Sequence, residues 1–195
     1  ASQHPLFDRI CTALAVLRPM IPLEVLASVS NTEPASVRSF LSDLGQEILL
    51  KGSLVQFRDE PTETWFQQQF RPKPESLVAF IAALRPQATS STYVAAALPH
   101  LMLGAGMIDE LIGIALASTD LPEADTIGRR DIETQRLHFA LRASIKANRN
   151  LEATKLALKA AGLAATGDRQ LETLQRNTDL AGRFLEPTQV LDLVS

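Results

Sequence analysis

The sequence predicts a mainly helical protein built in two parts, and three observations support this. Apolar residues recur at helical spacing over most of the chain, and a chain that is 46% hydrophobic can bury a core. The clearest departure from helical spacing is a short alternating segment around Gly52. Two prolines within residues 71–74 interrupt the pattern. We therefore place a boundary there, between domains at 1–72 and 75–195.

The first part is predicted to contain three helices followed by a β-hairpin. The predicted ranges are 6–18, 21–28 and 35–46 for the helices and 48–58 for the hairpin. Gly52 and Ser53 form a tight turn between two short apolar runs, and the residues after the turn alternate between the two faces of a strand. Three short helices and then a hairpin is the order of elements in a winged helix. A further helix is predicted at 62–70.

The second part is predicted to be almost entirely helical. Helices are expected near 75–84, 91–103, 107–117, 130–148, 151–161, 169–177 and 187–194. A weak internal repeat is visible, because residues 114–118 resemble residues 156–160 and, less closely, residues 191–195. Spacings of this size suit stacked helix-pair repeats, although similar composition alone is the alternative. The predicted fold class is thus mainly α, a winged-helix domain with a small β-hairpin followed by TPR-like, solenoid-forming helical repeats.

The composition argues against several classes of function. The net charge is −3 and the 19 Lys and Arg residues are scattered, whereas proteins that neutralise phosphates usually carry a basic cluster. No apolar run reaches the roughly 18 residues needed to cross a membrane, and no signal-peptide pattern opens the sequence. The single cysteine, Cys11, fits a buried residue in a reducing compartment. We therefore expect a cytoplasmic protein that binds neither membranes nor nucleic acids.

No catalytic pattern is recognisable in the sequence. It contains no Gly-rich phosphate loop, no paired cysteine or histidine spacing for a metal ion and no GxSxG motif. The three histidines, His4, His100 and His138, are far apart, and the last two have apolar neighbours that favour a packing role. We expect no catalytic residue, metal site or cofactor within this chain, which is not an enzyme as it stands. A small helical enzyme with dispersed residues stays an alternative.

Residues 57–66 stand out because four charges, a proline and the only tryptophan fall within ten residues. One interpretation is an ordinary helix start that docks on the core. Its expected parts are Asp59 or Thr62 as the cap, Glu63 near the positive helix end, and Trp65 and Phe66 on the core. The other interpretation is that Arg58 and its carboxylate neighbours face a ligand or another domain. Both can hold, because a cap can coexist with an outward-facing arginine.

With the preceding helices and hairpin, the Phe-Arg-Asp-Glu sequence at 57–60 resembles the winged-helix domain of STAND-type P-loop ATPases. These are NACHT- and NB-ARC-like signalling proteins that include bacterial antiviral defence proteins. The resemblance covers about residues 5–70. It implies that Arg58 lies where a histidine often contacts the nucleotide phosphates, and that Glu63 matches an acidic residue of the next helix. The ATP-binding core is absent from this chain, so the cofactor, ATP or ADP, belongs to the parent protein.

The resemblance also implies partners and a role. The winged helix would close over a nucleotide held by an upstream nucleotide-binding domain of the same protein, and the helical repeats would recognise a protein partner. The expected function is that of a non-catalytic regulatory or sensor fragment. The main alternative is a winged-helix transcriptional regulator with a helical dimerisation or ligand domain. Its recognition helix, however, would offer one cation, Arg38, against Asp43 and Glu47.

Overall fold

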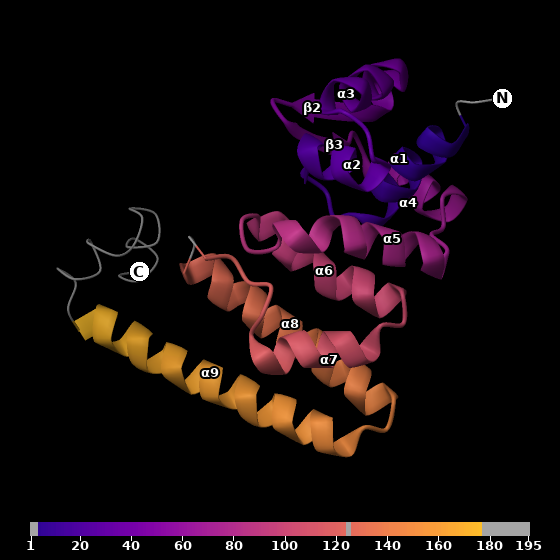
Figure 1. Ribbon diagram of the computed structural model, residues 1–195. Helices are drawn as coiled ribbons and strands as arrows, with labels where there is room; N and C mark the ends of the chain where they lie inside the picture. Colours follow the sequence, from indigo (N-terminus) through magenta and orange to yellow (C-terminus); the bar gives the residue numbers. More distant parts are fainter. Residues whose placement is uncertain (1–3, 124–125, 177–195) are drawn as a thin grey trace.

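The computed structural model describes residues 4–123 and 126–176, and it is mainly helical with a small antiparallel sheet (Figure 1). In order, the elements are α1 (His4–Val16), β1 (Ile21–Pro22), α2 (Leu23–Ser30), α3 (Pro34–Asp43), η1 (Gly45–Glu47), β2 (Ile48–Lys51), β3 (Leu54–Phe57), α4 (Glu60–Gln69), α5 (Pro74–Leu84), η2 (Arg85–Gln87), α6 (Thr92–Gly104), α7 (Ile108–Ala117), α8 (Thr126–Lys146) and α9 (Asn150–Arg176). The predicted mainly helical class is confirmed.

The predicted hairpin is confirmed, and it is joined by a third strand. Strands β2 and β3 pair antiparallel, with Ile48 opposite Phe57 and Lys51 opposite Leu54. The turn between them contains Gly52 at a φ of +64°, which glycine adopts without steric cost. Strand β1 pairs with β3 on its other side, so the sheet order is β1-β3-β2.

The prediction of one helix over 21–28 is wrong at its start. Ile21 and Pro22 form strand β1, and helix α2 begins only at Leu23. Ile21 is buried opposite Val55 of the hairpin, so a tertiary pairing overrides the local helical pattern. The helix expected over 35–46 also ends early, at Asp43, and a short 3₁₀ turn begins at Gly45, which has a φ of +74°.

One continuous cluster of buried residues runs through both predicted parts. It extends from Ile10 on α1 to Leu156 on α9. Helix α2 packs against α5 across the predicted boundary, while residues 71–73 between α4 and α5 lie outside regular structure. The first part therefore rests directly on the helices that follow it, as Figure 1 shows.

From α5 to α9 the helices stack as successive antiparallel neighbours (Figure 1). Alternate helices also touch, since α6 packs on α8 and α7 on α9. The two similar segments, 114–118 and 156–160, lie on α7 and α9 and contact each other through Lys159 and Ser118. The third segment of the predicted repeat, 191–195, and the helix predicted at 187–194 lie outside the described residues.

Helix α9 corrects another prediction. The glycines within 162–167 were expected to separate two helices, yet α9 runs from Asn150 to Arg176 without a break. Gly162 and Gly167 each cost the helix only about 1 kcal/mol relative to alanine. That cost is small beside a surrounding sequence rich in alanine and leucine, which are the best helix formers, and no proline interrupts it. None of the helices in the described part of the chain is long and apolar enough to cross a lipid bilayer.

Candidate functional site

Arg58 lies directly after β3, where the chain leaves the sheet and enters α4. Its backbone N–H donates to the carbonyl of Glu47 at 3.0 Å, which extends the hairpin pairing by one residue. Its side chain is exposed. The hairpin thus fixes the backbone of Arg58 and leaves the guanidinium on the outside of the molecule.

The predicted helix start after Arg58 is present. The Asp59 carboxylate accepts from the backbone N–H of Thr62 at 2.9 Å and caps α4. Hydrogen bonds from Thr62, together with the charge of Arg58, lower the pKa of Asp59. Of the two aromatic residues expected on the core, only Phe66 is buried. Trp65 remains 53% exposed, because its ring packs edge-on against the edge of an aromatic cluster rather than inside it.

Glu63 lies one turn further along α4 and lines a cavity of about 480 Å³ between the two parts of the chain. Its carboxylate accepts from the side chain of Gln67 at 3.1 Å. Arg18 after α1 and His100 on α6 line the same cavity. The structure therefore gathers a carboxylate, a guanidinium and an imidazole that lie far apart in the sequence.

Arg18 also joins the first part to the helix stack by two hydrogen bonds. The hydroxyl of Tyr93 on α6 donates to the Arg18 carbonyl at 2.7 Å. The Arg18 guanidinium donates to the side-chain oxygen of Gln135 on α8 at 3.4 Å. A third bond, from Gln87 to the hydroxyl of Ser28 at 3.0 Å, links η2 to α2.

His100 provides a pH-dependent prediction at this junction. Its pKa is lowered, first by desolvation and then by the charge of Arg18. The unfolded chain, where a histidine has a pKa of about 6.5, then binds more protons than the folded chain, so stability falls as the pH drops through and below that value. We expect His100→Gln to reduce this loss in urea unfolding between about pH 7 and pH 5. His138→Gln, which removes an imidazole at another position, is the control. The prediction is contradicted if an NMR titration gives His100 a pKa at or above the ordinary value for histidine.

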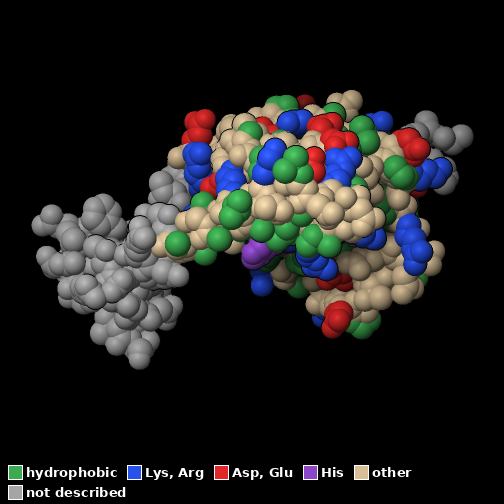
Figure 2. Space-filling model, turned by 90° about the horizontal axis from the view of Figure 1, so that it is seen from below, with side chains coloured by type: hydrophobic (Ala, Val, Ile, Leu, Met, Phe, Trp, Pro, Cys, Tyr) green, Lys and Arg blue, Asp and Glu red, His purple; other side chains and the backbone are tan. Residues whose placement is uncertain are grey.

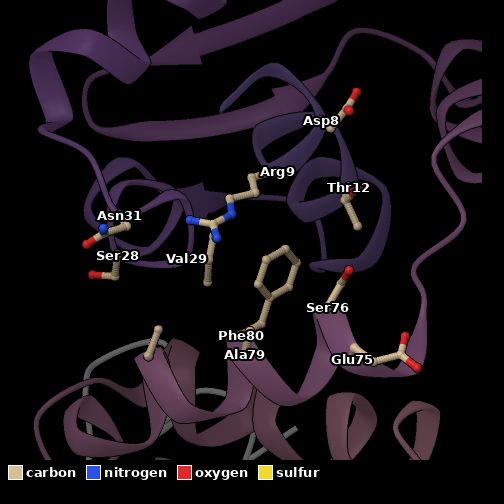
Figure 3. A pocket seen from close by; sticks show the side chains of 11 residues that line it. Asp8, Arg9, Thr12, Ser28, Val29, Asn31, Glu75, Ser76, Ala79 and Phe80 are labelled. Carbon is tan, nitrogen blue, oxygen red and sulfur yellow. The ribbon is translucent and has the colours of Figure 1, made fainter. Parts of the chain in front are cut away.

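A second cavity, of about 500 Å³, lies between α1, α2 and α5. Figure 3 shows Arg9 reaching into it between α2 and Phe80, whereas the carboxylates of Asp8 and Glu75 point away from its centre. Phe80 is nearly fully buried and belongs to the core. Most of the side chains that line the cavity are polar and it is open to solvent, so it is a surface recess between α1, α2 and α5.

A buried polar network closes the C-terminal end of α7. Arg136 on α8 is completely buried and donates to the carbonyls of Thr119 and, at 2.7 Å, of Asp120. Lys159 on α9 donates to the carbonyls of Ala115 at 2.7 Å and Leu116 at 2.8 Å. Cations at a helix C-terminus satisfy carbonyls that lack helical partners and complement the helix dipole. We assign these residues to the attachment of α8 and α9 to α7.

Carboxylates complete the same network. Glu133 lies 3.4 Å from the Lys159 ammonium and accepts from the hydroxyl of Ser118. Asp120 accepts from Arg85 at 3.0 Å, and Arg85 also binds Glu110 at 2.9 Å. Desolvation lowers the pKa of Arg136, while Asp120 and Glu133 act in the opposite direction. Sequence reasoning missed this network because its members come from four elements.

Neither the models of known protein families nor the curated proteins provide a match for this chain. Within residues 4–123 and 126–176, no group of three or more His, Cys, Asp and Glu side chains is placed to hold a metal ion. The charged side chains of Arg58 and Glu63 can form ion pairs and hydrogen bonds with a ligand or another domain. The stacked helices α5 to α9 offer helical surfaces on which another molecule can dock.

Proposed function

We propose that the chain is a non-catalytic regulatory module of a larger STAND-type signalling ATPase. In this proposal residues 1–72 form a winged helix that closes over a nucleotide held by an upstream domain. Residues 75–195 form helical repeats that recognise a protein partner. The observation that carries the proposal is the order of elements from α1 to β3, a helix, a short strand, two helices and a hairpin, with β1 paired to the hairpin.

The position of Arg58 supports a contact with nucleotide phosphates in the parent protein. Its backbone is fixed by the hydrogen bond to Glu47, and the Asp59 cap sets the direction of α4 immediately after it. The fixed backbone limits the region that the Arg58 guanidinium can reach. Guanidinium groups bind phosphate oxygens through paired, charge-assisted hydrogen bonds.

The stacked helices support the second half of the proposal. Repeats of paired helices contact mainly their neighbours and leave extended faces for other proteins. Helices α5 to α9 each pack on the next helix in sequence, and α6 also packs on α8 and α7 on α9. Exposed apolar side chains remain on α9, where Leu151 and Leu158 are 64% and 70% exposed. Figure 2 shows hydrophobic side chains along the face seen from below.

Isothermal titration calorimetry with ADP tests the nucleotide half of the proposal. The chain alone and the chain extended upstream in the parent gene are compared. We expect only the extended protein to bind, and Arg58→Ala to weaken its binding about tenfold or more, since a hydrogen bond to a charged group contributes about 1.5–3 kcal/mol. Lys51→Ala, which removes an exposed cation from the same hairpin, is expected to bind ADP normally.

Several results would count against this function. ATP hydrolysis by the pure chain contradicts a non-catalytic module. If the upstream sequence contains no phosphate loop and the extended protein binds no nucleotide, the ATPase assignment fails. Salt-dependent DNA binding that weakens on charge reversal at Arg38 would favour the transcriptional regulator, although Arg38 already donates to the carbonyl of Gly52 at 3.4 Å.

A further inference from the structure

An apolar groove lies where the end of α6, the start of α7 and the end of α8 meet. Its volume is about 860 Å³, larger than the two cavities described above. The apolar residues that line it are Leu103, Ile108, Phe139, Ala143, Ile145 and Ala147. Two of them are strongly exposed for their type, Leu103 at 38% and Ile145 at 60%. Apolar side chains left open beside a groove are typical of protein-binding surfaces.

Every charged or titratable group that lines this groove carries or can accept a positive charge. They are His100, Arg142 and Lys146. Arg142 and Lys146 lie one helical turn apart on α8, and both side chains are exposed. Asp109 and Glu110 directly follow the groove residue Ile108, but their carboxylates pair with Arg149 and Arg85, respectively. The groove therefore combines an apolar floor with a cationic rim.

The walls of the groove restrict the conformation of what can fill it. All three walls are helices, so they offer no strand edge to an extended peptide. A bound helix satisfies its own backbone hydrogen bonds and can insert apolar residues at i, i+3, i+4 and i+7. Carboxylates on both sides of that apolar face would meet Arg142 and Lys146.

We propose that this groove binds an acidic amphipathic helix of a partner protein. The apolar face of the helix covers Leu103, Phe139 and Ile145, and its flanking carboxylates pair with Arg142 and Lys146. This inference deepens the proposed function, since it rests on partner recognition by the helix stack. It does not depend on nucleotide binding upstream.

The test uses a synthetic, end-blocked peptide of about four helical turns, roughly 14 residues, with leucines at the four anchor spacings and glutamates on the flanks. Its fluorescence anisotropy is titrated with the whole chain. We expect saturable binding that weakens as salt is added, and no comparable binding of the same peptide with lysines in place of glutamates. Charge reversal at two contacts, Arg142→Glu with Lys146→Glu, is expected to weaken binding about tenfold or more.

Matched variants separate the groove from general electrostatics. Lys51→Glu with Arg71→Glu makes the same change in net charge at exposed positions in the first part and is expected to bind the acidic peptide normally. Ile145→Gln is expected to weaken peptide binding because it removes an apolar contact in the groove. The thermal unfolding midpoint is expected to stay unchanged, because this side chain is already 60% exposed.

Absence of binding by the acidic peptide, equal binding of the lysine peptide, or equal loss in both double variants overturns the inference. A concentration-dependent dimer that Ile145→Gln abolishes also overturns it, by assigning the groove to a second copy. Failure of the ADP titration with intact peptide binding overturns only the nucleotide half of the proposed function. Failure of the peptide titration with intact ADP binding overturns this groove alone.

Discussion

Replacing Arg136 with methionine is expected to lower the free energy of unfolding by about 3–6 kcal/mol, because two hydrogen bonds from a charged donor are lost and each contributes about 1.5–3 kcal/mol. Arg136 is completely buried, and its two donated hydrogen bonds hold the carbonyls of Thr119 and Asp120. Ser118 and Asp120, on either side of Thr119, have φ values of 54° and 55°, a conformation that side chains other than glycine seldom adopt. Without the guanidinium, the carbonyls of Thr119 and Asp120 lose the donor that holds this turn.

Urea unfolding followed by circular dichroism measures this loss. Arg142→Met on the exposed face of the same helix is the control, and its effect should stay within about 0.5 kcal/mol. If Arg136→Met does not fold, Arg136→Lys provides the measurement, because it keeps the charge but cannot make the paired geometry. A lysine variant as stable as the original chain would show that the paired geometry of the guanidinium contributes little.

Leu156→Ala is expected to loosen α9 and to cost about 2–5 kcal/mol, as large-to-small changes in a core commonly do. Within residues 150–165, where side-chain burial is described, Leu156 is the only fully buried large residue. Its neighbour Lys159, one turn later, binds the end of α7. Loss of the leucine leaves α9 held by the partly buried Ala160 and Leu163 and by the hydrogen bonds of Lys159.

Native-state hydrogen exchange resolves whether α9 opens alone. Protection should fall first in α9, while α1 to α4 keep theirs, because a terminal element of a stack can open without the rest. Leu158→Ala is the matched control, since this leucine is 70% exposed on the opposite side of the same helix. A uniform loss of protection in both parts would mean that the chain unfolds as one cooperative unit.

Local chemistry explains which elements were predictable from the sequence. The hairpin depends on a glycine turn and alternating residues, and both signals are local. Strand β1 could not be predicted because it is two residues long and exists through the pairing of Ile21 with Val55. The continuity of α9 through Gly162 was missed because a glycine weakens a helix without ending it. No side chain or backbone atom crowds that position, where a Cβ would meet nothing within 4 Å.

The candidate site also contains some features that local sequence signals predict and others that depend on long-range contacts. The Asp59 cap was predictable, since it needs only residues three apart. The junction of Arg18 with Tyr93 joins positions 75 residues apart, and Lys159 reaches α7 across more than 40. Long-range hydrogen bonds of this kind have no periodic signature. The burial of Arg136 was equally hidden, because a lone arginine in an amphipathic helix ordinarily lies on its solvated face.

Arg18 has a mechanical consequence for the molecule. Its carbonyl is held by Tyr93 on α6 and its guanidinium by Gln135 on α8. Tension applied through α1 therefore reaches two helices of the stack at once, by a route other than the covalent connection at residues 71–73.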